Sequence, residues 1–162
     1  MILKWSNEFS IGNNLIDSQH KKLFMLVNSL TRLNEKNSTA ADMTRTLDFI
    51  LKYAVRHFKD EEALQAMYDY PDYNAHKKTH DDFTQTAIML RDEHNKSFSY
   101  EKFKNLKNIL HDWVKQHVMV DDKKIGEFIK GRVPTFSKWL STNSKDVFRS
   151  FLYTTKTISS VP

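Results

Sequence analysis

Apolar residues recur every three to four positions along four long stretches of the chain, and polar residues fill the positions between them. This spacing is typical of amphipathic helices that turn one face toward a core. We expect helices over about residues 17–37, 40–69, 72–94 and 100–120, joined by short polar connections. The pattern therefore predicts an all-α fold in which neighbouring helices run antiparallel.

A few residues indicate where the expected helices begin and end. Asp17 or Ser18 should cap the first helix, because short polar side chains accept hydrogen bonds from the free N–H groups of a first turn. Tyr70-Pro71 should separate the second helix from the third, since the residue before a proline disfavours helical geometry. Gly and Pro occur only three times each, which favours long helices over loops.

The two ends of the chain depart from this pattern. Residues 1–14 should form an extended arm, whose apolar side chains Trp5, Phe9 and Ile11 pack across the outside or the end of the bundle. Apolar residues continue over 123–133, and Pro134 then interrupts the chain. We expect a bundle domain over 1–134 and a C-terminal extension over 135–162, with an amphipathic helix near 136–152. The extension could close over the bundle, form a dimer contact or bind a protein partner.

Composition and charge exclude several classes of function. The chain has no cysteine, so only histidine nitrogen and carboxylate oxygen could hold a metal ion. No apolar run is long enough to span a membrane, and the first residues lack the pattern of a secretory signal. We therefore expect no membrane partner and a cytoplasmic location. The net charge of +5 comes from lysines scattered over outer helix faces, which argues against nucleic-acid binding.

Several polar side chains fall on the apolar faces of the expected helices. His57 and Glu61 stand four residues apart, as do His76 and His80, so each pair lies on one face of its helix. A buried carboxylate such as Glu61 is costly unless a cation or a donor compensates it. Glu62 is turned away from Glu61 and should be a surface or supporting residue. Three further polar residues lie on or beside inward faces: His20, His117 and Asp122.

Taken singly, a histidine on an apolar face is more often an ordinary core residue than a ligand. The whole set is different, because each buried polar group without a partner costs roughly 1–3 kcal/mol. Five histidines and two carboxylates exceed the four ligands of one zinc ion. They suit two octahedral ions that share both carboxylates and one bridging oxygen, with one position open for a small ligand. Iron is favoured, although imidazole and carboxylate also suit zinc, copper and nickel.

Several short stretches together resemble a known family. They are Trp5, Ile11-Gly12, Ile16 to His20, His57 to Glu62, Tyr70-Pro71, His76 with His80, and Trp113 to His117 followed by Asp122. In this order they resemble the hemerythrin family in its bacterial form, over about residues 5–130. The resemblance implies an up-down-up-down four-helix bundle around a non-heme di-iron centre.

The resemblance also implies a role for each polar residue of the set. One iron would be held by His76, His80 and His117. The other iron would carry the open position and be held by His20 and His57. The two ions, Fe²⁺ or Fe³⁺, would be bridged by an oxo or hydroxo group, Glu61 and Asp122. The pocket for O2 would be lined by Leu23, Phe58, Val114 and Val118, with Trp113 adjacent.

On this interpretation the partner is dioxygen, and the function is its reversible binding for storage, delivery or sensing. The alternatives are a di-iron redox enzyme acting on O2, peroxide or NO, and the storage of iron. Di-iron enzymes of the ferritin-like type use mainly carboxylate ligands, whereas this set is rich in histidine. We also find no further buried acid or tyrosine near the open position that could deliver protons. The sequence therefore favours binding over turnover, and we assign no catalytic residue.

Overall fold

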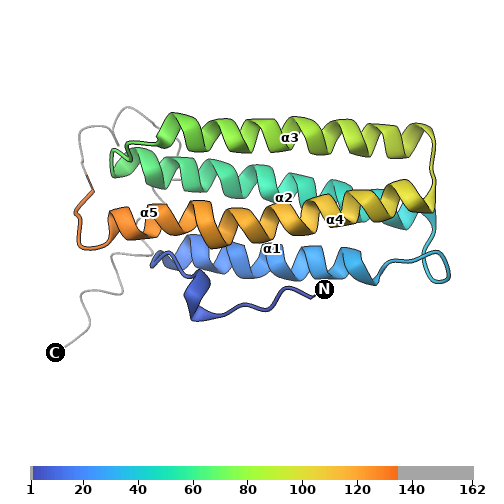
Figure 1. The fold of residues 1–162 in the computed structure, drawn as a ribbon, viewed down its shortest axis with the longest axis horizontal. Coiled ribbons are helices and arrows are strands. Elements are labelled where there is room, and N and C mark those ends of the chain that lie inside the picture. The colour runs from blue at the N-terminus through green and yellow to red at the C-terminus, as the bar shows by residue number, and fades with distance from the viewer. Residues whose placement is uncertain (1, 135–162) are drawn as a thin grey trace.

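In the computed structural model, which describes residues 2–134, four rods of helix lie side by side (Figure 1). The described residues contain no strand. The elements in chain order are η1 (Asn7–Phe9), α1 (Asn14–Arg32), α2 (Ala40–Met67), α3 (Tyr73–Lys96), α4 (Tyr100–Gln116), η2 (His117–Asp121) and α5 (Asp122–Ile129). The helix expected near 136–152, like the rest of the predicted extension, lies outside the described residues.

Contacts between neighbouring helices establish that they run antiparallel. The start of α2 adjoins the end of α3, where the Thr44 hydroxyl donates a hydrogen bond to the side chain of Asn95 over 2.9 Å. The start of α1 adjoins the end of α2, where the Gln19 amide donates to Asp60 over 2.6 Å. Helix α4 returns beside α1 and is continued by α5 (Figure 1). The predicted all-α, up-down-up-down four-helix bundle is confirmed.

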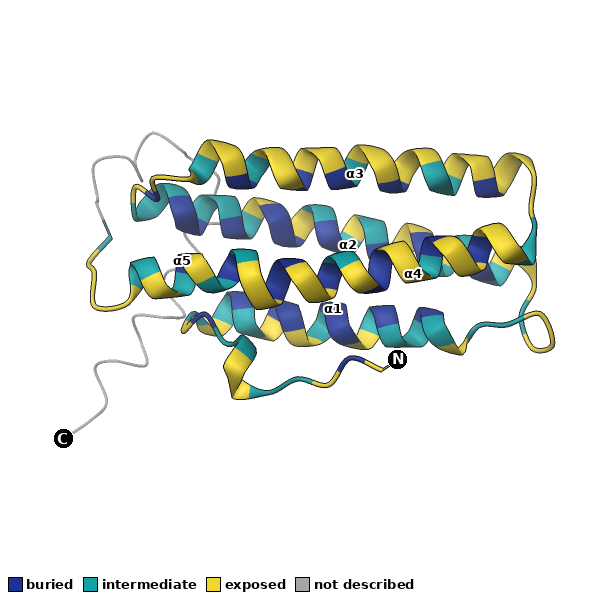
Figure 2. Ribbon diagram, viewed as in Figure 1, coloured by how far each residue is buried: buried dark blue, intermediate teal, exposed yellow. Residues whose placement is uncertain are grey.

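The core runs along the axis of the bundle. Buried residues occupy the faces that the helices turn toward one another, and the outward faces are exposed (Figure 2). Fully buried side chains include Val27, Leu30, Met43, Leu47 and Phe103. Burying such side chains stabilises a fold by about 1.5–3 kcal/mol each, before the entropy of ordering is subtracted. No helix among the described residues has both the length and the apolar character that crossing a membrane requires.

Helix α1 begins earlier than the sequence suggested. Its cap is Asn13, whose side-chain oxygen accepts hydrogen bonds from the N–H groups of Leu15 and Ile16. Asp17 lies inside the first turn, where its carboxylate accepts from the Ser10 hydroxyl at 2.6 Å and from the backbone N–H of residue 11 at 2.8 Å. The expected cap at Asp17 or Ser18 was therefore wrong, because Asp17 holds the preceding arm instead. The helix also ends earlier, at Arg32 rather than near 37.

The fourth rod contains a π-helical turn, η2, between α4 and α5. Within it the backbone N–H of Asp122 donates to the carbonyl of His117, five residues earlier. In a regular α-helix, residues five apart point in different directions, whereas a π-turn brings them nearer to one face. We expected Asp122 at or just past a helix end, but it lies within an almost continuous helical rod.

The N-terminal arm lies along the bundle and is fixed at several points. Asn28 on α1 accepts from the backbone N–H of Leu3 and donates to its carbonyl, at 2.8 and 2.7 Å. The rings of Trp5 and Phe9 pack edge-on against Phe24. The Lys123 ammonium on α5 donates to the carbonyl of residue 8 over 2.6 Å. The predicted packing of aromatic arm residues on the bundle is confirmed.

Candidate metal centre

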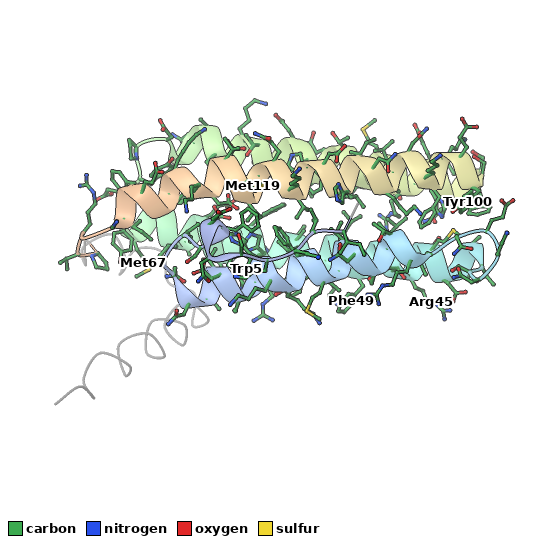
Figure 3. All side chains as sticks on the ribbon, turned by 60° about the horizontal axis from the view of Figure 1, so that its bottom comes forward. Trp5, Arg45, Phe49, Met67, Tyr100 and Met119 are labelled. Carbon is green, nitrogen blue, oxygen red and sulfur yellow. The ribbon has the colours of Figure 1, made fainter. Side chains whose placement is uncertain are left out.

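The four rods place seven polar side chains around one point inside the bundle. Helix α1 contributes His20, α2 contributes two residues, α3 contributes two, and the η2–α5 segment contributes the last two. All are buried, namely His20, His57, Glu61, His76, His80, His117 and Asp122. They lie toward the end of the bundle where α2 meets α3. Trp5 and Met119 lie in this half of the bundle, and Arg45 and Tyr100 lie at the opposite end (Figure 3).

The cluster consists of two overlapping groups of potential ligands. One group comprises Glu61, His76, His80 and His117, and the other comprises His20, His57, Glu61 and Asp122. Within each group the ligand atoms lie within 4.8 Å of one another. Every one of the seven residues singled out from the sequence belongs to a group. The two described histidines outside these groups, His94 and His111, are also buried.

The two carboxylates stand between the histidine groups. One oxygen of Glu61 lies 2.9 Å from Nε2 of His76, and the other lies 3.3 Å from Nε2 of His57. Asp122 repeats the arrangement, with one oxygen 3.1 Å from Nε2 of His117 and the other 3.1 Å from Nε2 of His20. Each carboxylate thus directs one oxygen toward each group, which is the geometry a bridging ligand requires.

Many of these buried atoms have no hydrogen-bond partner despite their short separations. They include Nε2 of His20, His57 and His76, one oxygen of Glu61 and both oxygens of Asp122. The angles fit no hydrogen bond, although the nitrogen–oxygen distances are those of ion pairs. Buried polar atoms are nearly always paired in proteins. Nitrogen and oxygen lone pairs that point into one space are suited to metal ions, and imidazole and carboxylate are common metal ligands.

Hydrogen bonds on the far side of the rings fix which histidine nitrogen carries a proton. Nδ1 of His80 lies 3.0 Å from a carboxylate oxygen of Glu62, and a carboxylate can only accept. Nδ1 is then the donor, and the lone pair of Nε2 points into the cluster. Nε2 of His80 lies only 2.8 Å from Nε2 of His117. Two nitrogens this close need a proton or a metal ion between them.

His57 is oriented by a similar chain of hydrogen bonds. The amide N–H of Gln19 donates to Asp60, so its oxygen is turned toward Nδ1 of His57, 3.0 Å away. Nδ1 of His57 must therefore donate, and its Nε2 also presents a lone pair to the cluster. Burial lowers the pKa of His57 well below its usual value, and the nearby imidazole of His20 lowers it further. His57 is thus held neutral, the form that binds metal.

The charge on the two other perturbed histidines depends on their neighbours. Burial lowers the pKa of His80, against the opposing hydrogen bond with Glu62. Burial also disfavours the charged form of His117, but the charge of Asp122 and the contact with Asp121 outweigh this and raise its pKa. The imidazole of His117 in turn lowers the pKa of Asp122, against the effect of burial. The charge of each of these groups therefore depends on its neighbours, as expected for side chains arranged around shared ions.

The seven residues singled out from the sequence lie together. Most of the residues that contact them were not singled out. Glu62 was expected at the surface or in a supporting place, and it contacts His80. Gln19, Asp60 and Gln65 were not singled out, although Gln65 is fully buried and donates to Glu61 over 3.1 Å. Gln65 follows Glu61 by four residues, so helical spacing alone could have indicated it.

Apolar and aromatic side chains enclose the cluster. Four of the residues that the resemblance places around the O2 pocket are buried, namely Leu23, Phe58, Val114 and Val118. Trp113 is partly buried and stacks on His117, with ring centroids 4.2 Å apart. Phe58 stacks on His80 at 4.0 Å. These contacts restrict rotation of the rings and keep water away from them.

Tyr70, which we had expected to help separate α2 from α3, is buried. Its ring packs against Phe128 of α5, with centroids 5.3 Å apart. Burial raises the pKa of its hydroxyl, and the charges of Asp72 and Asp121 add to the shift. The phenol therefore stays protonated over a wide pH range.

Comparison with known proteins gives a consistent result. The family model of the hemerythrin HHE cation binding domain matches residues 11–129. A hemerythrin-like protein of Naegleria gruberi is 35% identical over 120 residues, which cover 74% of this chain and 87% of that protein. A bacteriohemerythrin of Stenotrophomonas maltophilia is 26% identical over 155 residues, covering 91% of this chain and 98% of that protein.

Solved structures agree with the sequence matches. The crystal structure of wild-type hemerythrin superposes with a TM-score of 0.72 at 26% identity, covering 81% of this chain and all of that one. The match to the family model spans the bundle from the end of the arm to the end of α5. This chain therefore belongs to the hemerythrin family.

Proposed function

We propose that the chain binds dioxygen reversibly at a pair of iron ions held by the buried cluster. His76, His80 and His117 would hold one ion, and His20 and His57 would hold the other. Glu61, Asp122 and an oxo or hydroxo group would be shared between them. The observation that carries the proposal is the position of the two carboxylates, each with one oxygen toward either histidine group. Five imidazoles and three bridges would leave one coordination position open on two six-coordinate ions.

Bound iron would supply the open coordination position and the electrons that reversible binding of dioxygen requires. The protein supplies the surroundings of that position. The buried side chains of Leu23, Phe58, Val114 and Val118 carry no ionisable proton, and they exclude water from the cluster. None of these four side chains can donate a proton to a bound ligand, so they favour its release unchanged. This favours a binding protein over the alternatives of a redox enzyme or an iron store.

The visible absorption spectrum of the iron-loaded chain tests the proposal. The reduced protein is exposed to O2 and then degassed, and we expect a charge-transfer band that appears with O2 and disappears on degassing. Irreversible conversion to a ferric spectrum would contradict reversible binding and favour a redox enzyme. The absence of any response to O2 would favour iron storage.

A matched pair of variants tests the role of the dry surroundings. Val118 is buried and Val120, in the same π-turn, is 40% exposed. Val118→Thr keeps the shape of the side chain and adds a hydroxyl donor to the pocket, so we expect faster irreversible oxidation of the oxygenated protein. Val120→Thr adds the same group outside the pocket and should leave the rate unchanged. Equal rates in both variants would argue against the proposed pocket.

The ligand assignment is tested by metal content. Glu61→Ala removes a residue that both ligand groups share, and we expect it to prevent assembly of the pair. The control Glu101→Ala changes an exposed carboxylate in the first turn of α4. Elemental analysis should find two irons per chain in the control and fewer in the Glu61 variant. Two tightly bound irons in Glu61→Ala would contradict the assignment.

A further inference from the structure

The two halves of the cluster are supported by groups of different charge. We call His76, His80 and His117 the three-histidine half, and His20 and His57 the two-histidine half. In the three-histidine half, Nδ1 of His80 lies 3.0 Å from the carboxylate of Glu62. In the two-histidine half, Nδ1 of His57 faces only the neutral amide of a glutamine. The charge behind the rings therefore differs between the halves.

His117 and His20 extend this difference. Nδ1 of His117 lies 3.6 Å from a carboxylate oxygen of Asp121, an ion-pair separation. Nδ1 of His20 is fully buried and has no hydrogen-bond partner. The carboxylate of Asp60 lies behind Gln19 and is thus one residue further from His57. Within residues 2–134, carboxylates lie directly behind histidine rings in the three-histidine half, at His80 and His117, and none is found behind His20 or His57.

A carboxylate behind an imidazole strengthens that imidazole as a metal ligand. The negative charge attracts the proton on Nδ1 and increases the electron density at Nε2, which binds the cation. It also partly neutralises the charge of the ion in a site that water scarcely reaches. A neutral amide orients its histidine equally well but supplies no charge. The two halves should therefore differ in affinity by more than the number of their nitrogens implies.

We infer that the three-histidine half takes up its ion first and more tightly, and that Glu62 is the positioning residue that sets this order. The inference rests on the proposed pair of ions. Its physical basis is the charge of one carboxylate, which can be removed without loss of any ligand. Glu62 is only slightly exposed, and Glu62→Gln keeps its size and an oxygen that can accept from His80.

Titration of the metal-free chain with Co²⁺ alone, without oxygen and followed by calorimetry, measures both binding steps. For the unmodified chain we expect two resolved steps. In Glu62→Gln the first dissociation constant should rise about tenfold to a hundredfold, the usual effect of losing an outer partner of a metal ligand. The second constant should change little. An unchanged ratio of the two constants, or a single unresolved step in the unmodified chain, would overturn the inference.

A second variant tests the same idea from the other half. Gln19→Glu combined with Asp60→Asn moves the negative charge to a position directly behind His57 without changing the net charge. The new amide at 60 can still donate to the new carboxylate at 19. We expect the second dissociation constant to fall, so that the ratio of the two constants moves toward one. Asp60→Asn alone is the control, and it should leave the first step unaltered. A larger difference between the two dissociation constants in the double variant would overturn the inference.

Failure of the inference and failure of the proposed function give different results. If the chain binds O2 reversibly but fills both halves in one step, only the inferred loading order is contradicted. If the chain binds Co²⁺ in the expected order but shows no reversible band with O2, only the proposed function is contradicted. Circular dichroism of each metal-free variant should match that of the unmodified chain, because no buried contact is removed.

Discussion

Removing the metal should destabilise the bundle markedly. Six buried atoms that face the cluster have no hydrogen-bond partner: Nε2 of His20, His57 and His76, one oxygen of Glu61 and both oxygens of Asp122. At roughly 1–3 kcal/mol each, the total cost is about 6–18 kcal/mol if nothing compensates it. A typical domain is stable by only about 5–15 kcal/mol. Without metal, the unpaired groups would therefore offset much of the free energy of unfolding.

Part of this cost can be relieved in the metal-free chain. Histidine nitrogens and carboxylate oxygens lie about 3 Å apart, so small rotations and proton uptake can form some hydrogen bonds. Even half of the lower bound, about 3 kcal/mol, corresponds to a melting temperature lower by roughly 10 °C for a domain of this size. Thermal scans of far-ultraviolet circular dichroism, without oxygen and with or without Fe²⁺, measure this difference.

Two double variants make the test specific. Glu61→Gln with Asp122→Asn removes both buried charges, so we expect the metal-free form to melt above the metal-free unmodified chain and to gain little from iron. Asp81→Asn with Asp82→Asn removes two charges from exposed salt bridges on α3 and should leave the metal-dependent difference intact. Equal melting temperatures for the unmodified chain with and without iron would refute the reasoning.

Three further outcomes follow from the ends of the helices and from the arm. A Cβ at Gly126 would lie 2.7 Å from Cα of Ile11, so Gly126→Ala should displace the arm, cost about 1–3 kcal/mol and speed proteolysis of the arm. Thr39 accepts from the N–H of Asp42 in a capping box, and Thr39→Ala should cost about 1 kcal/mol in denaturant unfolding. Hydrogen bonds from Thr39 lower the pKa of Asp42 to about 2, which carboxyl NMR shifts can measure. Because this pKa is depressed on folding, its contribution to stability is present above pH 4 and is lost as the pH falls toward 2. A midpoint near 4 in the folded chain would contradict the capping box.

Helical spacing explains why the sequence indicated that these polar residues would lie together. A helix of known phase places residues four apart on one face, so His57 and Glu61 had to point the same way. Because five histidines lie on inward faces, they all point toward the axis of the bundle, where they can approach one another. The boundaries were less certain, because Asp17 has the chemistry of a cap but is used to hold the arm.

The supporting residues could not be found in the same way. Gln19 and Asp60 both carry polar side chains at the edge of a helix face, and such positions resemble an ordinary solvated surface. Their hydrogen bond joins residues 41 positions apart, which depends on how α1 and α2 are aligned. The π-turn is similar, since only the spacing of five between His117 and Asp122 indicated it. Both features depend on how neighbouring helices pack, and the periodicity within a single helix carries no information on that packing.

The attachment of the arm has a consequence for the order of folding events. The hydrogen bond from Lys123 to the carbonyl of residue 8 spans 115 positions of the chain, nearly the whole described length. Closing so large a loop is entropically expensive unless the bundle has already brought α1 and α5 together, which leaves only the short segment before α1 to be seated. The four rods can therefore gather their histidines before the arm is seated, and Trp5 reaches the ring of His20 only afterwards. We expect a folding interval in which the ligand set is assembled but still accessible from the side that the arm later covers.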